Sequence, residues 1–303
     1  MDKFELRLTE LLGTAAVKTQ EMMKNHTTFR IGGPASYFVV PDSSSQLSAV
    51  VRLCRDEEVP YVILGNGSNL LVGDLGYEGV VIVLGEEFSR CRIEADRITA
   101  GGGVKLSVIA RRALEAGLTG FEFAGGIPGT LGGALVMNAG AYGGEMKDVL
   151  ESARVMTREG EVLTLTAEQL ELGYRTSCIP SNGYILLEGT IRLQPGDPSA
   201  IEASMKDLAG RRRDKQPLEF PSAGSTFKRP AGHFAGKLIE EAGLRGYQVG
   251  GAQVSEKHCG FVINTGDATA ADVLTLCRDV RDRVEQLSGV VLEMEIKKLG
   301  RFE

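Results

Sequence analysis

GFEFAGGIPGTLGGALVMNAGAYGG, residues 120–144, is the stretch that decides the fold of this 303-residue chain. It is rich in glycine, largely apolar and nearly uncharged. Each glycine costs about 1 kcal/mol relative to alanine inside a helix, so the stretch predicts neither a stable helix nor a stable strand. Because glycine has no Cβ, the segment can bring backbone N–H groups close to a flat or anionic ligand. Tight turns between buried strands are the alternative, although turn glycines usually stand among polar residues.

A second glycine-rich loop, GNGSN at residues 65–69, follows an expected strand. The N–H groups of such a loop can form an anion-binding nest, and a simple hairpin turn is the alternative. The loop is not a Rossmann fingerprint, because Leu70 stands where the third glycine of GxGxxG belongs. The second glycine cluster downstream favours a ligand-binding role for this loop.

Composition and charge exclude several classes of protein. The net charge of −6 gives no global attraction for nucleic acid or for an anionic membrane. The first residues, MDKFELRLTELL, lack the basic start and apolar core of a signal peptide, and no run reaches the roughly 18 apolar residues of a membrane span. We expect a cytoplasmic, globular, monomeric protein whose partner is a small molecule rather than nucleic acid or a membrane.

No metal site or familiar nucleotide or hydrolase motif is expected. The five cysteines are scattered without a CxxC pair, and the chain has three histidines. GHFAGK, residues 232–237, is one residue short of a P-loop and is followed by Leu238 instead of Ser or Thr. Ser225 has no GxSxG context, and nothing marks a histidine as its base, so a serine-hydrolase triad has little support.

Hydrophobic periodicity and turn residues predict the elements along the chain. Strands are expected at 37–41, 59–65, 80–84 and 91–100, short antiparallel strands within 152–193, and helices at 44–58, 104–116, 199–216 and 269–288. The closing helix has Thr269 as its expected N-cap, Gly289 as its stop, and Val273, Cys277, Val280, Val284 and Leu287 on its buried face.

These elements predict a mixed α/β and α+β protein in several parts. Residues 1–85 and 86–216 form two subdomains, the second a mainly antiparallel sheet that contains the glycine-rich stretch. Two prolines follow the helix at 199–216 and mark a boundary, beyond which 217–290 forms a separate α/β part. Residues 291–303 are expected to return to the part formed by the first two subdomains, as a C-terminal strand.

The last expected strand, 290–299, carries two glutamates on one face. Val290, Leu292, Met294 and Ile296 alternate with Glu293 and Glu295. A solvated strand edge is one interpretation, and a carboxylate that points into a site is the other. In the third part, Lys215, Lys228, Arg229, Lys237, Lys257 and His258 are consistent with a pocket for an anionic ligand or, individually, with solvated side chains.

Six segments together resemble the UDP-N-acetylenolpyruvoylglucosamine reductase family over nearly the whole chain. They are TFRIGGPA (28–35), ILGNGSNLLV (63–72), GFEFAGGIPGTLGGALVMNAGAYGGE (120–145), GYRTS (173–177), AGSTFKRP (223–230) and LEMEI (292–296). The resemblance implies a two-part FAD-binding domain of the vanillyl-alcohol-oxidase type plus a separate α/β substrate-binding domain. It also implies non-covalent FAD, NADPH as co-substrate and a UDP-sugar substrate.

The resemblance carries site residues over by motif. Those implied to bind FAD are Arg30, Gly65, Asn66, Gly67, Ser68, Asn69, Leu70, Gly125, Gly126, Ile127, Pro128, Gly129, Thr130, Gly132, Gly133, Asn138, Ala139, Gly140 and Tyr142. Those assigned to the substrate are Tyr174, Lys215, Gly224, Phe227, Lys228, Lys237, Gln253, Ser255, Lys257 and His258.

The implied reaction reduces the enolpyruvyl group of UDP-N-acetylglucosamine enolpyruvate, giving UDP-N-acetylmuramate for peptidoglycan synthesis. Hydride passes from NADPH through FAD N5 to the vinyl C3, and C2 is then protonated. By motif, Arg175 stabilises charge on the carboxylate side, Ser225 donates the proton, and Glu295 assists Arg175, with Glu293 as the alternative glutamate.

One departure points to a shorter subtype. The longer family members carry a tyrosine-bearing loop over the substrate, and the spacing from Arg175 through Leu193 to Pro217 leaves little room for it. Two other functions stay open: a different flavoprotein of the same superfamily, and a non-catalytic nucleotide-binding module. A covalent flavin tether through histidine is disfavoured, because His26 lies outside the glycine loops.

Overall fold

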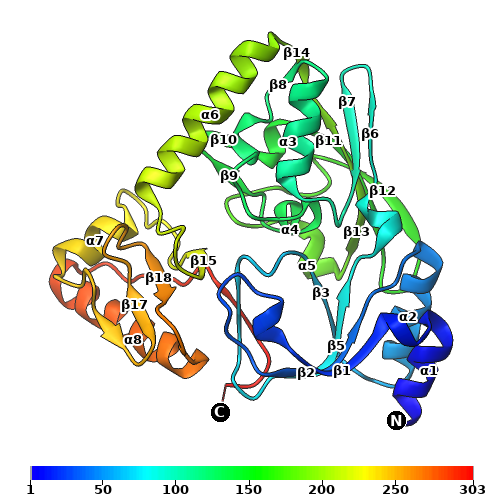
Figure 1. Cartoon of the computed structure of the whole chain (residues 1–303), viewed down its shortest axis with the longest axis horizontal. Helices are drawn as coiled ribbons and strands as arrows, with labels where there is room; N and C mark the ends of the chain where they lie inside the picture. The colour runs from blue at the N-terminus through cyan, green and yellow to red at the C-terminus, as the bar shows by residue number, and fades with distance from the viewer. Residues whose placement is uncertain (1, 303) are drawn as a thin grey trace. The chain divides into compact units, whose positions relative to one another are not determined.

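This computed structural model describes residues 2–302, which divide into two compact units (Figure 1). Unit 1 comprises the residues up to Thr19, Tyr37–Asn66 and Gly79–Arg212. Unit 2 comprises Gln20–Ser36, Gly67–Glu78 and the residues from Arg213 onward. The segments of the two units alternate along the chain. The division into four consecutive parts that the sequence suggests therefore stays a prediction.

The first sheet follows the expected β-α-β order. Its strands are β1 (Val17–Met22), β2 (Pro34–Val39), β5 (Tyr77–Val83) and β3 (Tyr61–Leu64), in this spatial order. The pair β3 and β5 is parallel. Helix α2 (Ser44–Asp56) begins where Ser43 accepts the N–H of Gln46, and its apolar face is buried with α1 (Lys3–Leu12) in one core.

A five-stranded antiparallel sheet forms the second layer of unit 1. Its order is β12 (Val162–Thr166), β11 (Leu150–Met156), β13 (Ile185–Arg192), β7 (Arg97–Gly101) and β6 (Cys91–Glu94). The antiparallel prediction for 152–193 is confirmed. The single strand predicted at 91–100 is wrong, because Ala95 adopts a positive φ of 54° and turns the chain into the β6–β7 hairpin.

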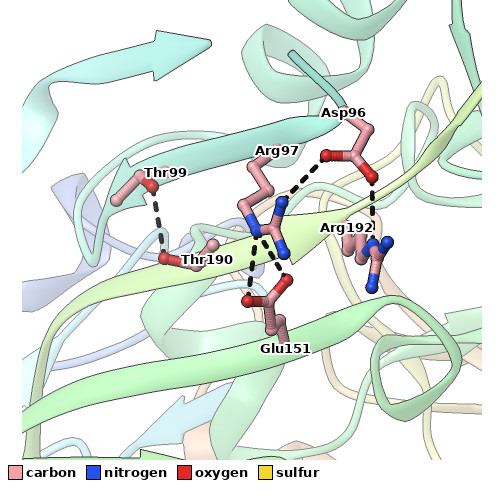
Figure 2. A network of polar contacts seen from close by, with 6 residues as sticks. All are labelled: Asp96, Arg97, Thr99, Glu151, Thr190 and Arg192. Carbon is pink, nitrogen blue, oxygen red and sulfur yellow. Dashed lines mark hydrogen bonds and ion pairs between the residues drawn. The ribbon is translucent and has the colours of Figure 1, made fainter. Parts of the chain in front are cut away.

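The outer face of this sheet carries a network of charged side chains (Figure 2). Arg97 donates to Glu151 at 2.9 Å and to Asp96 at 3.0 Å, and Arg192 donates to Asp96 at 3.0 Å. The Arg97–Glu151 pair joins β7 to β11, and Arg192 of β13 joins the β6–β7 turn, which favours the observed register. On the other face, α3 (Leu106–Glu115) and α4 (Leu131–Val136) pack into the apolar core.

The glycine-rich stretch forms more regular structure than expected. It contains α4 and the small hairpin of β9 (Gly140–Ala141) and β10 (Gly144–Glu145). Thr130 caps α4, and the N–H of Gly132 donates to the carbonyl of Gly102 at 2.9 Å. A Cβ at Gly132 would lie 3.0 Å from that carbonyl oxygen, so the glycine permits a close contact between α4 and this loop. The poor helix propensity of glycine argued against a helix here, and that prediction was wrong.

Three further elements lie between β12 and β15. Helix α5 (Cys178–Asn182) precedes β13, and β14 (Gln194–Pro195), which pairs with β8 (Leu118–Thr119), and α6 (Pro198–Lys215) follow it. Of the described residues of α6, Ile201 alone is buried, and the exposed faces carry i,i+4 ion pairs such as Lys206–Glu202. The remaining short helical turns are Thr14–Ala16, Met23–Asn25, Glu86–Ser89, Glu122–Ala124 and Met146–Asp148.

Unit 2 has a four-stranded antiparallel sheet with helices. The order is β15 (Ser222–Ser225), β18 (Phe261–Asn264), β17 (Ala252–Val254) and β16 (Gln248–Val249). Helices α7 (Ala235–Glu241) and α8 (Ala270–Ser288) share its core. The caps predicted for α8 are confirmed, but the prediction that Leu287 is buried is wrong, since that side chain is 63% exposed.

The expected C-terminal strand is mostly irregular. Only β19 (Lys297–Leu299) is a strand, and it pairs in parallel with β4 (Leu70–Val72). Met294 forms an isolated bridge with Phe227. The chain from Val290 to Ile296 is therefore no regular strand, and its side chains need not alternate between two faces. Within residues 2–302, no helix is long and apolar enough to cross a bilayer.

Candidate active site

The first two residues of the GNGSN loop, Gly65 and Asn66, lie beside the glycine-rich stretch in unit 1. The side-chain amide of Asn66 donates to the carbonyl of Pro128 at 2.8 Å, across 62 positions of sequence. A Cβ at Gly65 would lie 2.6 Å from Thr130 Oγ1. The two segments singled out from sequence therefore meet at one place, as expected if they serve one ligand.

The glycines at this place have two different roles. Gly65, Gly132, Gly140 and Gly144 pack so tightly that a Cβ would meet protein atoms at 3.0 Å or less. At Gly129 and Gly133 the nearest atoms would be 3.9 and 3.8 Å away. The turn interpretation thus explains the first set, whereas the second set leaves bare backbone surface. Such a surface fits a flat cofactor such as FAD, because no side chain holds the ligand away from the backbone.

The glycine-rich stretch also includes a hairpin turn and contacts a half-buried arginine. Tyr142 and Gly143 form the tip of the β9–β10 hairpin, with φ of 54° and 93°, and Tyr142 is exposed. A Cβ at Gly126 would lie 3.4 Å from Arg212, whose pKa is lowered because its guanidinium is partly buried. Sequence reasoning missed Arg212. Its only signal in the sequence is the basic run RRRDK at residues 211–215, which ends the helix expected at 199–216.

Five predicted FAD residues belong to unit 2: Arg30, Gly67, Ser68, Asn69 and Leu70. Arg30 is exposed and has a positive φ of 56°, in a turn where its N–H donates to Thr27. Gly67 accepts from the N–H of Thr28 at 3.2 Å, so the second half of the GNGSN loop lies beside this turn. Asn69 donates to the carbonyl of Glu295 at 3.4 Å and accepts from the N–H of Lys297.

Ser225 lies at the end of β15, and the next residue, Thr226, is hydrogen-bonded to the C-terminal segment. Gly224 precedes it with a positive φ of 78°, at a register shift in the β15–β18 pair. Thr226 follows it and is fully buried, with its hydroxyl accepting the N–H of Val262 and its carbonyl accepting the N–H of Glu295 at 2.9 Å. Ser225 itself is exposed. The backbone around the serine is therefore fixed while its hydroxyl stays accessible.

The two candidate glutamates have opposite environments. Glu293 is exposed and forms an ion pair with Lys228, which also donates its backbone N–H to Glu293. Glu295 is only 9% exposed. Because the segment is not a regular strand, two residues predicted to share one face differ in burial. The buried glutamate is the one whose backbone is hydrogen-bonded next to Ser225.

Arg175 stands at the tip of a tight turn in unit 1. Gly173 and Thr176 close the turn through two backbone hydrogen bonds of 3.1 and 3.3 Å. Arg175 has a positive φ of 55°, and its guanidinium lies 5.4 Å from the centroid of the exposed Tyr174 ring. Ser225 and Glu295 belong to unit 2.

Several predicted substrate residues carry charge at the surface of unit 2. Lys257 donates to the carbonyl of Arg213 at 2.7 Å, and Lys215 is exposed. Burial lowers the pKa of His258, and the positive charges of Arg245 and Lys215 lower it further. The two lysines are consistent with the expected anionic ligand, and the lowered pKa of His258 favours its neutral form.

The remaining predicted substrate residues are engaged within unit 2. Phe227 lies in the core, and the buried hydroxyl of Ser255 accepts the N–H groups of Lys257 and His258. Gln253 donates to the carbonyl of Gly246, and Lys237 pairs with Glu241 at 3.6 Å. Among residues 2–302, no cluster of three or more His, Cys, Asp or Glu side chains is arranged to hold a metal ion.

Comparisons with known proteins place this chain in a family. The model "FAD binding domain" matches residues 35–166, and "UDP-N-acetylenolpyruvoylglucosamine reductase, C-terminal domain" matches residues 216–299. Two relatives bear the name UDP-N-acetylenolpyruvoylglucosamine reductase. The protein from Agathobacter rectalis is 52% identical over 311 residues, with 99% of each chain covered. The protein from Clostridioides difficile is 53% identical over 295 residues, with 97% of each covered.

A solved structure agrees with the sequence relatives. The crystal structure of UDP-N-acetylenolpyruvylglucosamine reductase from Thermus caldophilus has a TM-score of 0.82 and 37% identity, covering 93% of this chain and 98% of its own. The predicted fold class is thereby confirmed, as are FAD as cofactor and oxidoreductase as enzyme class. The chain belongs to the UDP-N-acetylenolpyruvoylglucosamine reductase family, FAD-dependent enzymes of peptidoglycan precursor synthesis.

Proposed function

We propose that this protein uses NADPH to reduce UDP-N-acetylglucosamine enolpyruvate to UDP-N-acetylmuramate. The observation that carries the proposal is that Ser225 and Glu295 lie on two neighbouring segments of unit 2. An accessible hydroxyl and a buried glutamate lie on two segments joined by the Glu295 N–H to Thr226 carbonyl hydrogen bond. Proton transfer to carbon requires a donor held in a fixed position, and this backbone contact supplies the fixed frame.

The open glycine surface of unit 1 fits FAD, which when bound would supply hydride chemistry for the reduction of the enolpyruvyl group by NADPH. The residues that would hold it there are Asn66 and the backbone from Gly126 to Gly133. Arg212, which lies against Gly126, adds a positive charge at the same surface.

Arg175 binds the substrate carboxylate in this proposal. A guanidinium can hold a carboxylate through two parallel hydrogen bonds and keeps its charge at every physiological pH. As the enolpyruvyl group accepts hydride, negative charge builds up on the carboxylate side, and a fixed cation stabilises that charge. The exposed turn that carries Arg175 is consistent with contact to a ligand.

Ser225 Oγ donates the proton to C2, and Glu295 assists Arg175 on the carboxylate side. A hydroxyl is a weak acid, but the enolate-like partner is strongly basic and exclusion of water favours the transfer. Lys215, Lys257 and His258 are suited to the anionic UDP portion, because they present positive charge or hydrogen-bond donors on one unit.

The chain matches the shorter subtype of the family in this proposal. The interval from Arg175 to Pro217 is occupied by α5, β13, β14 and α6, which leaves no long loop for a substrate-covering tyrosine. We further propose a cytoplasmic monomer without nucleic-acid or membrane partners, supported by the net charge of −6.

An absorption experiment tests the reaction and the substrate together. We expect purified protein to be yellow, to bleach under anaerobic NADPH and to recolour when UDP-N-acetylglucosamine enolpyruvate is added. Denaturation should release the flavin, since it is not covalently bound. Bleaching without recolouring would instead favour another flavin-dependent oxidoreductase of the same fold, and protein that stays colourless with added FAD would contradict the site.

The two glycine roles predict opposite effects of alanine. Gly65→Ala should lower the stability of the apo-protein by about 1–3 kcal/mol, because its Cβ would clash with Thr130 Oγ1. Gly133→Ala should not destabilise the apo-protein, since the residue is exposed within α4 and alanine favours helix by about 1 kcal/mol. We expect Gly133→Ala to weaken FAD binding nonetheless. Thermal unfolding without FAD and fluorescence titration with FAD measure the two effects, and unchanged FAD affinity in Gly133→Ala would remove this glycine from the cofactor surface.

A further inference from the structure

The turn that carries Arg175 has a conformation that its own sequence does not favour. Arg175 adopts a left-handed φ of 55°, a region in which non-glycine residues persist only when the surroundings impose it. The two backbone hydrogen bonds between Gly173 and Thr176 close the turn but do not attach it to the rest of unit 1. Other contacts must therefore set where the turn points.

Asn138 provides such an attachment. Its side chain is 1% exposed, and its Nδ2 donates to the carbonyl of Gly173 at 3.1 Å. The same nitrogen donates to Glu145 at 2.8 Å, and Oδ1 accepts the N–H of Lys147 at 2.9 Å. Both N–H groups and the carbonyl of the amide are thus engaged within the protein. An amide committed in this way is poorly placed to serve as a ligand for FAD, the role that motif resemblance implied.

Glu145 and Lys147, the other hydrogen-bond partners of the Asn138 amide, are fixed by further contacts. Glu145 forms an ion pair with Lys147 at 2.6 Å and a reciprocal capping box with Asp148. Ser177, directly after the turn, donates its hydroxyl to the carbonyl of Val136 at 3.0 Å. The Arg175 turn is therefore tied by side chains to the segment 136–148, which also contains the hairpin of Tyr142.

We propose that Asn138 is a positioning residue, which fixes the turn so that Arg175 meets the substrate carboxylate, and that it touches neither FAD nor substrate. The inference rests on the proposed function, because it assumes the role given to Arg175. A two-point contact between guanidinium and carboxylate demands accurate placement, and a misplacement of about 1 Å can lower a rate about 100-fold. Loss of the Asn138 amide should therefore slow the step that consumes the substrate and spare the step that consumes NADPH.

Two substitutions test the role of the side-chain amide at position 138 separately from the role of the backbone conformation there. Asn138 has a positive φ of 39°, which glycine tolerates, so Asn138→Gly removes the side chain without imposing backbone strain. Asn138→Asp keeps the size and the acceptor for Lys147 but loses both donated hydrogen bonds and faces Glu145 with a like charge. Asn182→Ala is the matched control, because it removes an amide that donates to the Cys178 carbonyl at 3.0 Å, away from Gly173.

Stopped-flow absorption gives the decisive readout on holoenzyme. For Asn138→Gly and Asn138→Asp, we expect FAD content and anaerobic reduction by NADPH to match the wild type. Reoxidation by UDP-N-acetylglucosamine enolpyruvate should be slowed about 10- to 100-fold. The control should behave as the wild type in every step. Folded variants that lack FAD would overturn the inference and return Asn138 to cofactor binding; Asn138→Asp decides the matter if Asn138→Gly does not fold.

Arg175→Ala distinguishes failure of this inference from failure of the proposed function. If Arg175→Ala reoxidises at the wild-type rate, the role of Arg175 is wrong. If Arg175→Ala is slow while both Asn138 variants are fast, the positioning role is wrong and the proposed function stands. We expect Asn138→Gly to slow reoxidation no further when added to Arg175→Ala, because both act through one contact. A full additional loss in the double variant would contradict the inference.

Discussion

Ser225→Ala should retain FAD and its reduction by NADPH but lose turnover by about 10²–10⁴-fold, the usual contribution of a positioned proton donor. The reason is local: the hydroxyl is the only group removed, and it is exposed at the end of β15. The adjacent Thr226 keeps its buried hydrogen bonds to Val262 and Glu295, so the backbone frame should survive. Steady-state turnover and anaerobic flavin reduction, measured on one preparation, check both halves of the expectation.

Ser222→Ala is the matched control on the same strand. Ser222 accepts the hydroxyl of Thr28 through its backbone carbonyl, a contact that alanine preserves. We expect this control to turn over at close to the wild-type rate. Normal turnover in Ser225→Ala would show that another group delivers the proton. Loss of NADPH-dependent bleaching in Ser225→Ala would instead point to damage at the cofactor surface.

Much of the fold could be predicted from local signals. The caps of α8 were predictable because Thr269 and Gly289 act through side-chain and backbone chemistry within a few residues. The β6–β7 hairpin was not, since its turn passes through Ala95, a residue type that rarely takes a positive φ. The prediction for Leu287 failed for another reason, because helical periodicity assigns it to the buried face although its side chain is 63% exposed in the last turn of α8.

The part of the candidate site that consists of glycine-rich backbone could be predicted from the sequence. Both glycine loops were singled out, and the Asn66–Pro128 hydrogen bond brings them together. The pattern could not separate glycines that pack against protein from those with open surface, because that difference depends on distant segments. Arg212 was missed for the same reason: a basic run at the end of a helix does not tell which arginine is partly buried.

Glu295→Gln should reduce turnover by about 10²-fold or more, with FAD content and reduction by NADPH unchanged. Glutamine keeps the shape of the side chain but removes the carboxyl group that assists Arg175 in the proposed mechanism. Burial strengthens the effect, because a charge or proton held away from water interacts more strongly with its neighbours. Reoxidation of reduced enzyme by substrate, followed by absorption, measures the loss directly.

Glu293→Gln supplies the comparison, since it makes the same chemical change two residues away. Glu293 is exposed and pairs with Lys228, and a surface ion pair contributes about 0–1 kcal/mol. Its removal should leave turnover close to the wild type. Sequence alternation treats the two glutamates as equivalent, whereas burial and the backbone contact to Thr226 single out Glu295. A large loss of turnover in Glu293→Gln, with normal turnover in Glu295→Gln, would reverse the assignment. Glu293, the exposed residue, would then be the catalytic glutamate.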